Sequence, residues 1–147
     1  RVDCGFLRLP APPELETIFL ERDNLRAILP PEHPLAALER VPLAALCEDP
    51  FLMLVKEKNT EFAQLFVQHG LTPNVHFTAW DDYAIMSMVE NGLGISVLPE
   101  LILRRVPYRI VTRPLNVPAY RDIALALRDK ETASLAVKRF LEYLKFR

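Results

Sequence analysis

Few side chains in this 147-residue sequence have the types and spacing that covalent chemistry requires. Ser87 and Ser96 are potential nucleophiles, but one falls in a helical pattern and the other in a strand pattern, and no motif places a base beside either. No Gly-x-Ser-x-Gly nucleophile elbow occurs. His33 has no second histidine at metal-ligand spacing, and His69 ends a helical pattern, where an imidazole interacts with the helix dipole. The sequence therefore predicts no catalytic residue, no metal site and no cofactor.

Gly92 and Gly94 form the other arrangement that suggests chemistry. A dinucleotide-binding loop needs a third glycine and lies after a strand and before a helix. Residues 92–94 lack the third glycine and follow a helical pattern that leads into a strand. Backbone geometry explains both positions, because Gly92 suits a left-handed helix cap and Gly94 lets the backbone pass close to another element. We therefore expect no nucleotide at this loop.

The elements that would position a binding site alternate between strand and helix. Residues 51–55, 75–79 and 95–98 have strand patterns, whereas residues 60–69 and 81–91 carry apolar side chains at helical spacing. Such alternation predicts a parallel sheet with right-handed crossovers. In open sheets of this kind, ligands bind beyond the carboxyl ends of the strands.

Polar and aromatic residues follow two of these predicted strands. They are candidates for contact with a ligand, although the two aspartates also suit a second role as caps of the following helix. Asn59 or Thr60 would likewise begin the earlier helix. The candidates are Lys56, Asn59, Thr60, Trp80, Asp81 and Asp82.

Composition and charge exclude several classes of protein. The sequence is 50% hydrophobic and 25% charged, which is ordinary for a globular protein. A net charge of -1 gives no sign of a basic nucleic-acid-binding surface, and no apolar run is as long as a membrane span. Cys4 and Cys47 are expected to be reduced thiols, with a disulfide between them left open. The chain starts at Arg1 and resembles a piece of a longer protein.

Four segments resemble, in their order and spacing, the effector-binding half of LysR-type transcriptional regulators. The resemblance runs from about residue 2 to residue 144, and the glycine-containing run that ends at Pro99 is its most specific part. The four segments are Asp3-x-x-Phe6-Leu7, Ala27-Ile28-Leu29-Pro30 with His33-Pro34-Leu35-Ala36, Pro50-Phe51, and Met88-Val89-x-x-Gly92-Leu93-Gly94-Ile95-Ser96-x-Leu98-Pro99.

This resemblance implies an α/β fold with two lobes, like that of type 2 periplasmic binding proteins, and mixed, mainly parallel sheets. Residues 1–22 and 119–147 would form lobe I, and residues 23–118 would form lobe II. Lobe I would be incomplete, because its first strands and helices have no counterpart in the chain. An effector would lie in the cleft between the lobes.

The resemblance also implies a function. We expect a cytoplasmic sensing domain that binds a small metabolite, performs no chemistry, does not contact membranes and associates with itself as a dimer or larger oligomer. DNA would be bound only through a helix-turn-helix segment that this chain does not contain. The alternative is a solute-binding protein of the same fold that delivers a small molecule to a transporter, although no signal sequence opens the chain.

Carried over by motif position, Arg8 approaches the cleft from lobe I, and Trp80 and Asp81 approach it from lobe II. Trp80 departs from the small polar residue expected there, which favours a flat or apolar effector or else a side chain packed on its own lobe. Arg8, Lys56 and the helix start at Asn59 together predict an anionic group on the effector. The aspartates at the other helix start would repel such a group.

Overall fold

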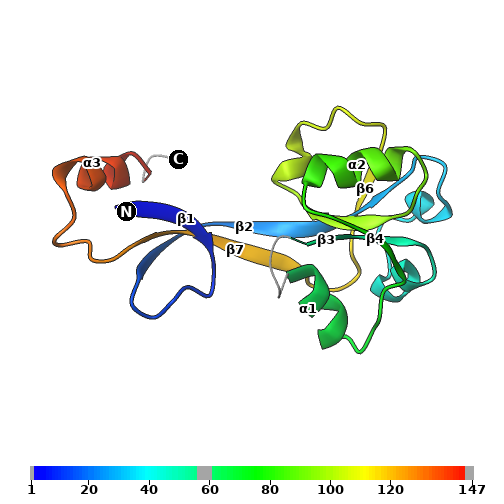
Figure 1. The fold of residues 1–147 in the computed structure, drawn as a ribbon, viewed down its shortest axis with the longest axis horizontal. Helices are drawn as coiled ribbons and strands as arrows, with labels where there is room; N and C mark the ends of the chain where they lie inside the picture. Colours follow the sequence, from blue (N-terminus) through cyan, green and yellow to red (C-terminus); the bar gives the residue numbers. More distant parts are fainter. Residues whose placement is uncertain (1, 56–60, 145–147) are drawn as a thin grey trace. The chain divides into compact units, whose positions relative to one another are not determined.

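The computed structural model describes residues 2–55 and 61–144. The chain forms two compact units, one of residues 1–23 with 121–147 (unit 1) and one of residues 24–120 (unit 2). Figure 1 shows the strands and helices along the chain. In order they are β1 (Cys4–Arg8), β2 (Glu16–Leu29), the 3₁₀ helices η1 (Pro34–Ala37) and η2 (Leu43–Cys47), β3 (Phe51–Leu54), α1 (Glu61–Gln68), β4 (Val75–Ala79), α2 (Asp82–Glu90), β5 (Ser96–Pro99), the 3₁₀ helix η3 (Ile102–Arg104), β6 (Val111–Pro114), β7 (Tyr120–Leu127) and α3 (Leu135–Leu144).

Unit 2 contains the parallel sheet that the alternating pattern predicts. β3 pairs with β4 in parallel, from Phe51 opposite Val75 to Leu54 opposite Ala79. β5 follows on the other side of β3, where Phe51 and Ile95 form a parallel bridge. Figure 1 shows α2 on one side of these strands and α1 on the other, as expected when helices connect parallel strands.

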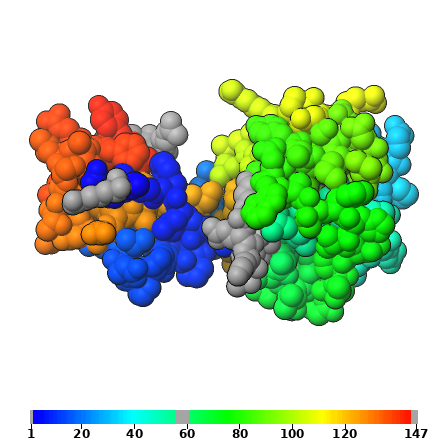
Figure 2. Space-filling model, viewed as in Figure 1, coloured from blue at the N-terminus to red at the C-terminus, as the bar shows by residue number. Residues whose placement is uncertain are grey.

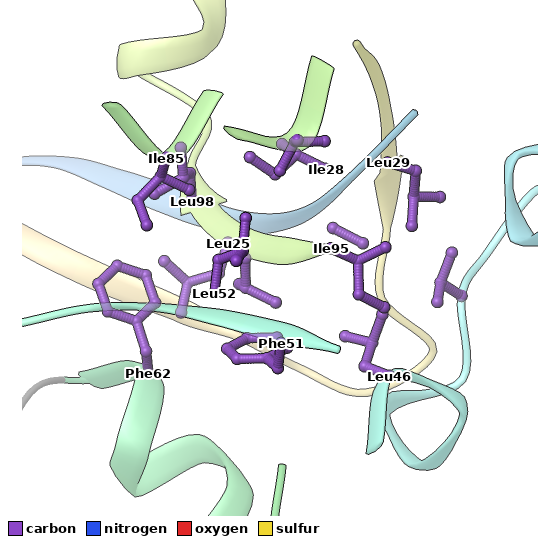
Figure 3. Packing of buried hydrophobic residues seen from close by; sticks show 14 of the residues in the cluster. Leu25, Ile28, Leu29, Leu46, Phe51, Leu52, Phe62, Ile85, Ile95 and Leu98 are labelled. Carbon is purple, nitrogen blue, oxygen red and sulfur yellow. The ribbon is translucent and has the colours of Figure 1, made fainter. Parts of the chain in front are cut away.

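The core of unit 2 lies between these strands and helices (Figure 3). Ile28 of β2, Leu52 of β3, Ile85 of α2 and Leu98 of β5 are all fully buried. The aromatic rings of Phe51 and Phe66 meet edge to face, with their centroids 5.2 Å apart, which brings α1 against β3. Burial of this many large apolar side chains makes unit 2 the main source of hydrophobic stabilisation in the chain.

The sheets are mixed, but antiparallel ladders contribute more to them than we expected. β2 pairs antiparallel with β5 and with β6, and β1 pairs antiparallel with β7. Among the described residues, the one parallel ladder joins β3 and β4, and two isolated parallel bridges join Phe51 to Ile95 and Val41 to Leu115. The reason is that only the helical crossovers of unit 2 bring consecutive strands back in the same direction.

β2 corrects another expectation. From the sequence alone, the polar residues 21–24 suggest a break between two short strands, yet β2 continues through them and has 14 residues. Asp23 is only 2% exposed, and Nε and Nη2 of Arg121 each lie 2.9 Å from its Oδ2. Arg22 donates from Nε and Nη2 to the two carboxylate oxygens of Asp122 at 2.8 and 3.0 Å. These hydrogen bonds hold the pKa of Asp122 below its usual range and let charged residues stay within a strand.

Unit 1 has a much smaller core than unit 2. Leu125 and Leu127 of β7 pack against Val137 and Leu141 of α3. The backbone N–H of Val137 donates to Oγ of Ser134 at 3.3 Å, so Ser134 caps α3. Large apolar side chains of this unit remain exposed, among them Val2, Phe6, Phe19 and Leu135.

The reversal between α2 and β5 has the geometry that its glycines predict. Gly92 has φ +73°, and its N–H donates to Val89, while the N–H of Leu93 donates to Met88. This is the hydrogen-bonding pattern of a left-handed C-terminal cap. A Cβ on Gly94 would meet the carbonyl oxygen of Pro50, would lie 3.1 Å from its carbonyl carbon, and would lie 3.2 Å from Cδ2 of Leu52.

Replacing Gly94 with valine should therefore destabilise the protein. The added Cβ collides with backbone atoms of Pro50 that cannot move without shifting β3. We expect a loss of about 1–3 kcal/mol in the free energy of unfolding, the usual range for overpacking, measured by urea denaturation. Gly5→Val is the matched control, because no atom lies within 4 Å of a Cβ at Gly5. Equal midpoints for the two variants would contradict the close approach.

Candidate functional site

The carboxyl ends of β3 and β4 lie side by side at one edge of the parallel sheet. Leu54 pairs with Ala79, and the N–H of Val55 donates to the carbonyl oxygen of Ala79 at 2.8 Å. Val55 and Trp80, the residues that directly follow these two strands, therefore leave the sheet from the same edge. This arrangement, which we call the β3–β4 edge, is the place where parallel α/β sheets bind ligands.

Three of the expected site residues lie outside the described residues, namely Lys56, Asn59 and Thr60. The elements on either side of them are described: β3 ends at Leu54, and α1 begins at Glu61.

Trp80 presents its indole to solvent at the β3–β4 edge. The sequence left open whether this ring would pack on its own unit, but the residue is 72% exposed. Tyr83, in the first turn of α2, is 48% exposed. Two large aromatic side chains thus lie at the end of β4 and the start of α2, where a flat apolar surface could contact the body of a ligand.

Asp81 and Asp82 both have structural roles at the start of α2. Asp81 is the N-cap, with φ -121° and ψ 131°, and its Oδ1 accepts the N–H of Ala84 at 2.9 Å. Asp82 is only 8% exposed and lies in the first turn, where a carboxylate complements the helix dipole. The capping role expected for Asp81 is confirmed. Because the helix start already faces two carboxylates, it offers little attraction to an anion.

Arg8 is the remaining residue of the expected site and belongs to unit 1. It is the last residue of β1, is half-buried, and lies opposite Ile123 of β7. The other candidates belong to unit 2. A joint role for Arg8 and the β3–β4 edge stays a prediction.

The histidines and cysteines show no arrangement for catalysis or metal binding. Nδ1 of His33 accepts the N–H of Leu35 and its Nε2 lies 3.2 Å from Asp49, while Nδ1–H of His69 donates to the carbonyl oxygen of Leu65 at 2.8 Å. Cys4 and Cys47 are free thiols, as expected. Burial, followed by the charge of Glu48, raises the pKa of Cys47 and so disfavours a reactive thiolate. Within the described ranges, no group of three or more potential ligands is placed to hold a metal ion.

The ion pairs between β2 and β7 are polar features that sequence reasoning missed. An Arg-Asp dipeptide occurs at residues 22–23 and again at residues 121–122, and each arginine pairs with the aspartate of the other dipeptide. The repeated dipeptide was the available signal. Its pairing follows only from the strand neighbours, which are distant in the sequence.

Unit 1 contains a cavity of about 700 Å³ that no motif indicated. It is lined by Ile18 and Leu20 of β2 and by Leu141 and Leu144 of α3, with Lys138 at its rim. Lys138 already donates to the carbonyl oxygen of Glu131. The cavity is also lined by the exposed charged residues Lys130, Glu131 and Glu142. We place the candidate site at the β3–β4 edge because the carboxyl ends of parallel strands meet there.

The β3–β4 edge carries exposed aromatic rings and lies next to the start of α2. No nucleophile–base pair lies among the residues described there. These features are those of an α/β domain suited to non-covalent binding. The family model described as LysR substrate binding domain matches residues 1–147. The chain belongs to this family. No helix in the described part of the chain combines the length and apolar character that a membrane-spanning segment needs.

Curated relatives are regulators named for a helix-turn-helix. The chain is 34% identical over 146 residues to the uncharacterized HTH-type transcriptional regulator YvbU of Bacillus subtilis, covering 98% of this chain and 50% of that protein. It is 29% identical over 147 residues to the probable HTH-type transcriptional regulator LrrA of Synechococcus elongatus, covering 99% of this chain and 49% of that protein. The chain thus spans about half the length of these relatives.

Solved structures confirm the fold. HinK, a LysR family transcriptional regulator from Pseudomonas aeruginosa, has a TM-score of 0.84 at 26% identity over 99% of this chain and 53% of its own. The CcmR regulatory domain of Synechocystis, solved in complex with 2-PG, has a TM-score of 0.82 at 25% identity over 97% of this chain and 71% of its own. The fold is therefore the type 2 periplasmic-binding-protein-like α/β fold of LysR effector-binding domains, as the four motif segments predicted.

Asp81→Ala should shorten α2 at its first turn and destabilise the protein, because the N–H of Ala84 loses its acceptor. We expect a loss of about 1 kcal/mol in the free energy of unfolding, measured by urea denaturation. Asp81→Asn is the control, since asparagine caps helices equally well while removing the charge. If the alanine and asparagine variants unfold at the same urea concentration, the cap contributes nothing.

Proposed function

We propose that this chain is the sensing domain through which a small metabolite controls DNA binding by a LysR-type regulator, with DNA recognised by a helix-turn-helix outside these 147 residues. The observation that carries the proposal is the family match along the whole chain. The names of the curated relatives support the helix-turn-helix part. The β3–β4 edge supplies a place for the metabolite in unit 2.

The kind of effector follows from the chemistry of the candidate residues. CcmR, which shares the fold, was solved with a small molecule, 2-PG, so a small-molecule effector suits this domain. We propose that an anionic group of the effector is held by Arg8 and Lys56, assisted by the start of the helix that follows Asn59. Trp80, exposed at the β3–β4 edge, would contact the uncharged body. Asp81 would keep the anionic group away from α2.

The proposal includes no chemical step. The proposal is supported by the family and the curated relatives, which are transcriptional regulators rather than enzymes. Ser96, one of the two serines considered as nucleophiles, is also unsuited to that role, because it is buried and its hydroxyl donates to the carbonyl oxygen of Leu52 at 2.6 Å. The alternative of a solute-binding protein finds no support in the curated relatives, which are named as regulators.

Small anionic metabolites should raise the melting temperature of the chain more than their neutral amides do, because a ligand that binds only the folded state stabilises it. With a confirmed ligand, Arg8→Ala and Lys56→Ala should each weaken binding by about 1.5–3 kcal/mol in calorimetry, the value of a hydrogen bond to a charged group. Asp81→Asn, which keeps the helix cap, should leave binding unchanged or improve it.

The exposed Arg128 supplies the control for these variants, since it follows Leu127 at the opposite end of the β1–β7 ladder from Arg8, and Arg128→Ala removes a charge there. If Arg8→Ala binds as tightly as the parent, or if cations are the tightest ligands found, the proposed anion site fails. In that case the two aspartates at the start of α2 become the better candidates.

Self-association is a further part of the proposal. Phe6 and Phe19 of unit 1 are 63% and 57% exposed, and exposed apolar patches on a soluble chain are usually covered by a partner. Light scattering should therefore give a mass above that of the monomer. Phe6→Glu combined with Phe19→Glu should restore the monomer mass, whereas Val67→Glu on unit 2 should not. A monomeric parent at high concentration would contradict this expectation.

A further inference from the structure

A cavity beside α1 has a volume of about 310 Å³, and the residues described around it all belong to unit 2. One of its walls is a stripe of α1, and the opposite wall is formed by Leu25 of β2 and residues 118–120. None of the expected effector-site residues that the structure describes lines it. We call this cavity the α1 groove. The α1 residues that line it are Glu61, Gln64, Leu65 and Gln68.

The two walls of the α1 groove are fixed by local structure. Positions 61, 64, 65 and 68 are spaced as i, i+3, i+4 and i+7, so their side chains share one face of the helix. In the opposite wall, the N–H of Leu25 donates to the carbonyl oxygen of Ala119 at 2.9 Å. Figure 1 shows α1 beside the start of β7, and Figure 2 shows the green segment that contains α1 at the surface of unit 2.

The α1 groove has an apolar bottom and a polar rim. Leu25 and Leu65 are only 3% and 5% exposed, so they lie at its bottom. Gln64 and Gln68 are exposed, as is Tyr120, so their polar groups lie where the groove opens to solvent. Apolar contact area combined with a few polar groups that fix orientation is the usual composition of a small-molecule site.

Glu61 sets the charge of the α1 groove. Among the described residues that line the groove, it is the one with a charged side chain. It is half-buried in the first turn of α1. The helix dipole places about half an elementary positive charge at this end, whereas a carboxylate carries a full negative charge, so the carboxylate outweighs the dipole. The groove therefore attracts a cation and repels an anion.

The neutral groups at the rim favour the same kind of ligand. The carboxamide oxygens of Gln64 and Gln68 and the phenolic oxygen of Tyr120 can all accept hydrogen bonds. An ammonium group has three N–H donors and no acceptor, so a carboxylate flanked by such oxygens matches it. A volume of about 310 Å³ is at the lower limit for small-molecule sites, so the rest of the ligand must be short.

We propose that the α1 groove binds a small alkylammonium compound. The carboxylate of Glu61 holds the ammonium group with help from the carboxamides of Gln64 and Gln68, and the hydrocarbon part lies on Leu25 and Leu65. This site goes beyond the proposed sensing function, because its charge preference is opposite to that of the anion site and its described lining residues are different. A ligand with so few atoms binds weakly, with a Kd on the order of 1 mM.

NMR titration of the whole chain with butylammonium chloride, in a buffer free of amines, tests the proposal. The side-chain amide signals of Gln64 and Gln68 report on the groove directly, and the single leucine variants Gln64→Leu and Gln68→Leu assign them. We expect butylammonium to shift both signals saturably. Butanol, which has the same length without the charge, and butanoate, which has the opposite charge, should bind at least about tenfold more weakly, the loss expected for a charge-assisted hydrogen bond.

Glu61→Gln should weaken butylammonium binding by about tenfold or more, because the carboxylate is lost while the side chain keeps its length. Glu39→Gln is the matched control, since it removes the same charge from an exposed position of unit 2 that does not line the groove. It should leave binding unchanged. Gln64→Leu combined with Gln68→Leu, followed through the backbone N–H signal of Leu65, should also weaken binding and keeps residues that favour a helix.

Three results would overturn the proposal. The first is the absence of a saturable shift of the two glutamine signals with butylammonium. The second is an equal shift with butanol or butanoate, which would show that the groove does not select an ammonium group. The third is a loss of binding in Glu39→Gln as large as that in Glu61→Gln, which would assign the effect to the overall charge of the chain.

Discussion

The hydrogen bonds between the start of β5 and β3 hold unit 2 together. The N–H of Ile95 donates to Pro50 and the N–H of Leu52 donates to Ile95, each at 2.9 Å. These bonds exist only because Gly94 has no side chain to collide with Pro50. They close a strand–helix–strand unit around α2. The position of Trp80 and Asp81 at the sheet edge follows from the pairing of β4 with β3, in which Ala79 lies opposite Leu54.

Charged side chains are satisfied in different ways at three places, namely the ion pairs between β2 and β7, the start of α2, and the arginines at positions 40 and 113. The arginines and aspartates on β2 and β7 neutralise one another in bidentate or buried pairs, which are far stronger than exposed single contacts. The carboxylate of Asp81 is satisfied by the start of its own helix. Among the described residues, the guanidinium groups of Arg40 and Arg113 donate to backbone carbonyl oxygens and to no carboxylate.

The elements of unit 2 could be predicted because each one carries its pattern locally. β3 is an unbroken apolar run, and α1 repeats apolar residues at helical spacing and ends at Gly70 with φ +65°. β2 could not be predicted as one strand, because the partner that satisfies Asp23 is Arg121, 98 residues away.

Of the candidate site, the shared edge of β3 and β4 followed from topology. The exposure of Trp80 did not, because an indole at the end of a strand is equally suited to packing.

The sequence by itself determined the family through four motif segments. It also determined the local geometry at glycines and helix caps, because the requirements of these positions are set within a few residues. It also determined that nothing in the chain is spaced for covalent chemistry. Only the tertiary structure decided which charges are neutralised and which remain. Ion pairs such as Arg22 with Asp122 join residues 100 positions apart, so the net charge of -1 does not reveal them. Electrostatic energy depends on distance in space, and the fold alone sets that distance.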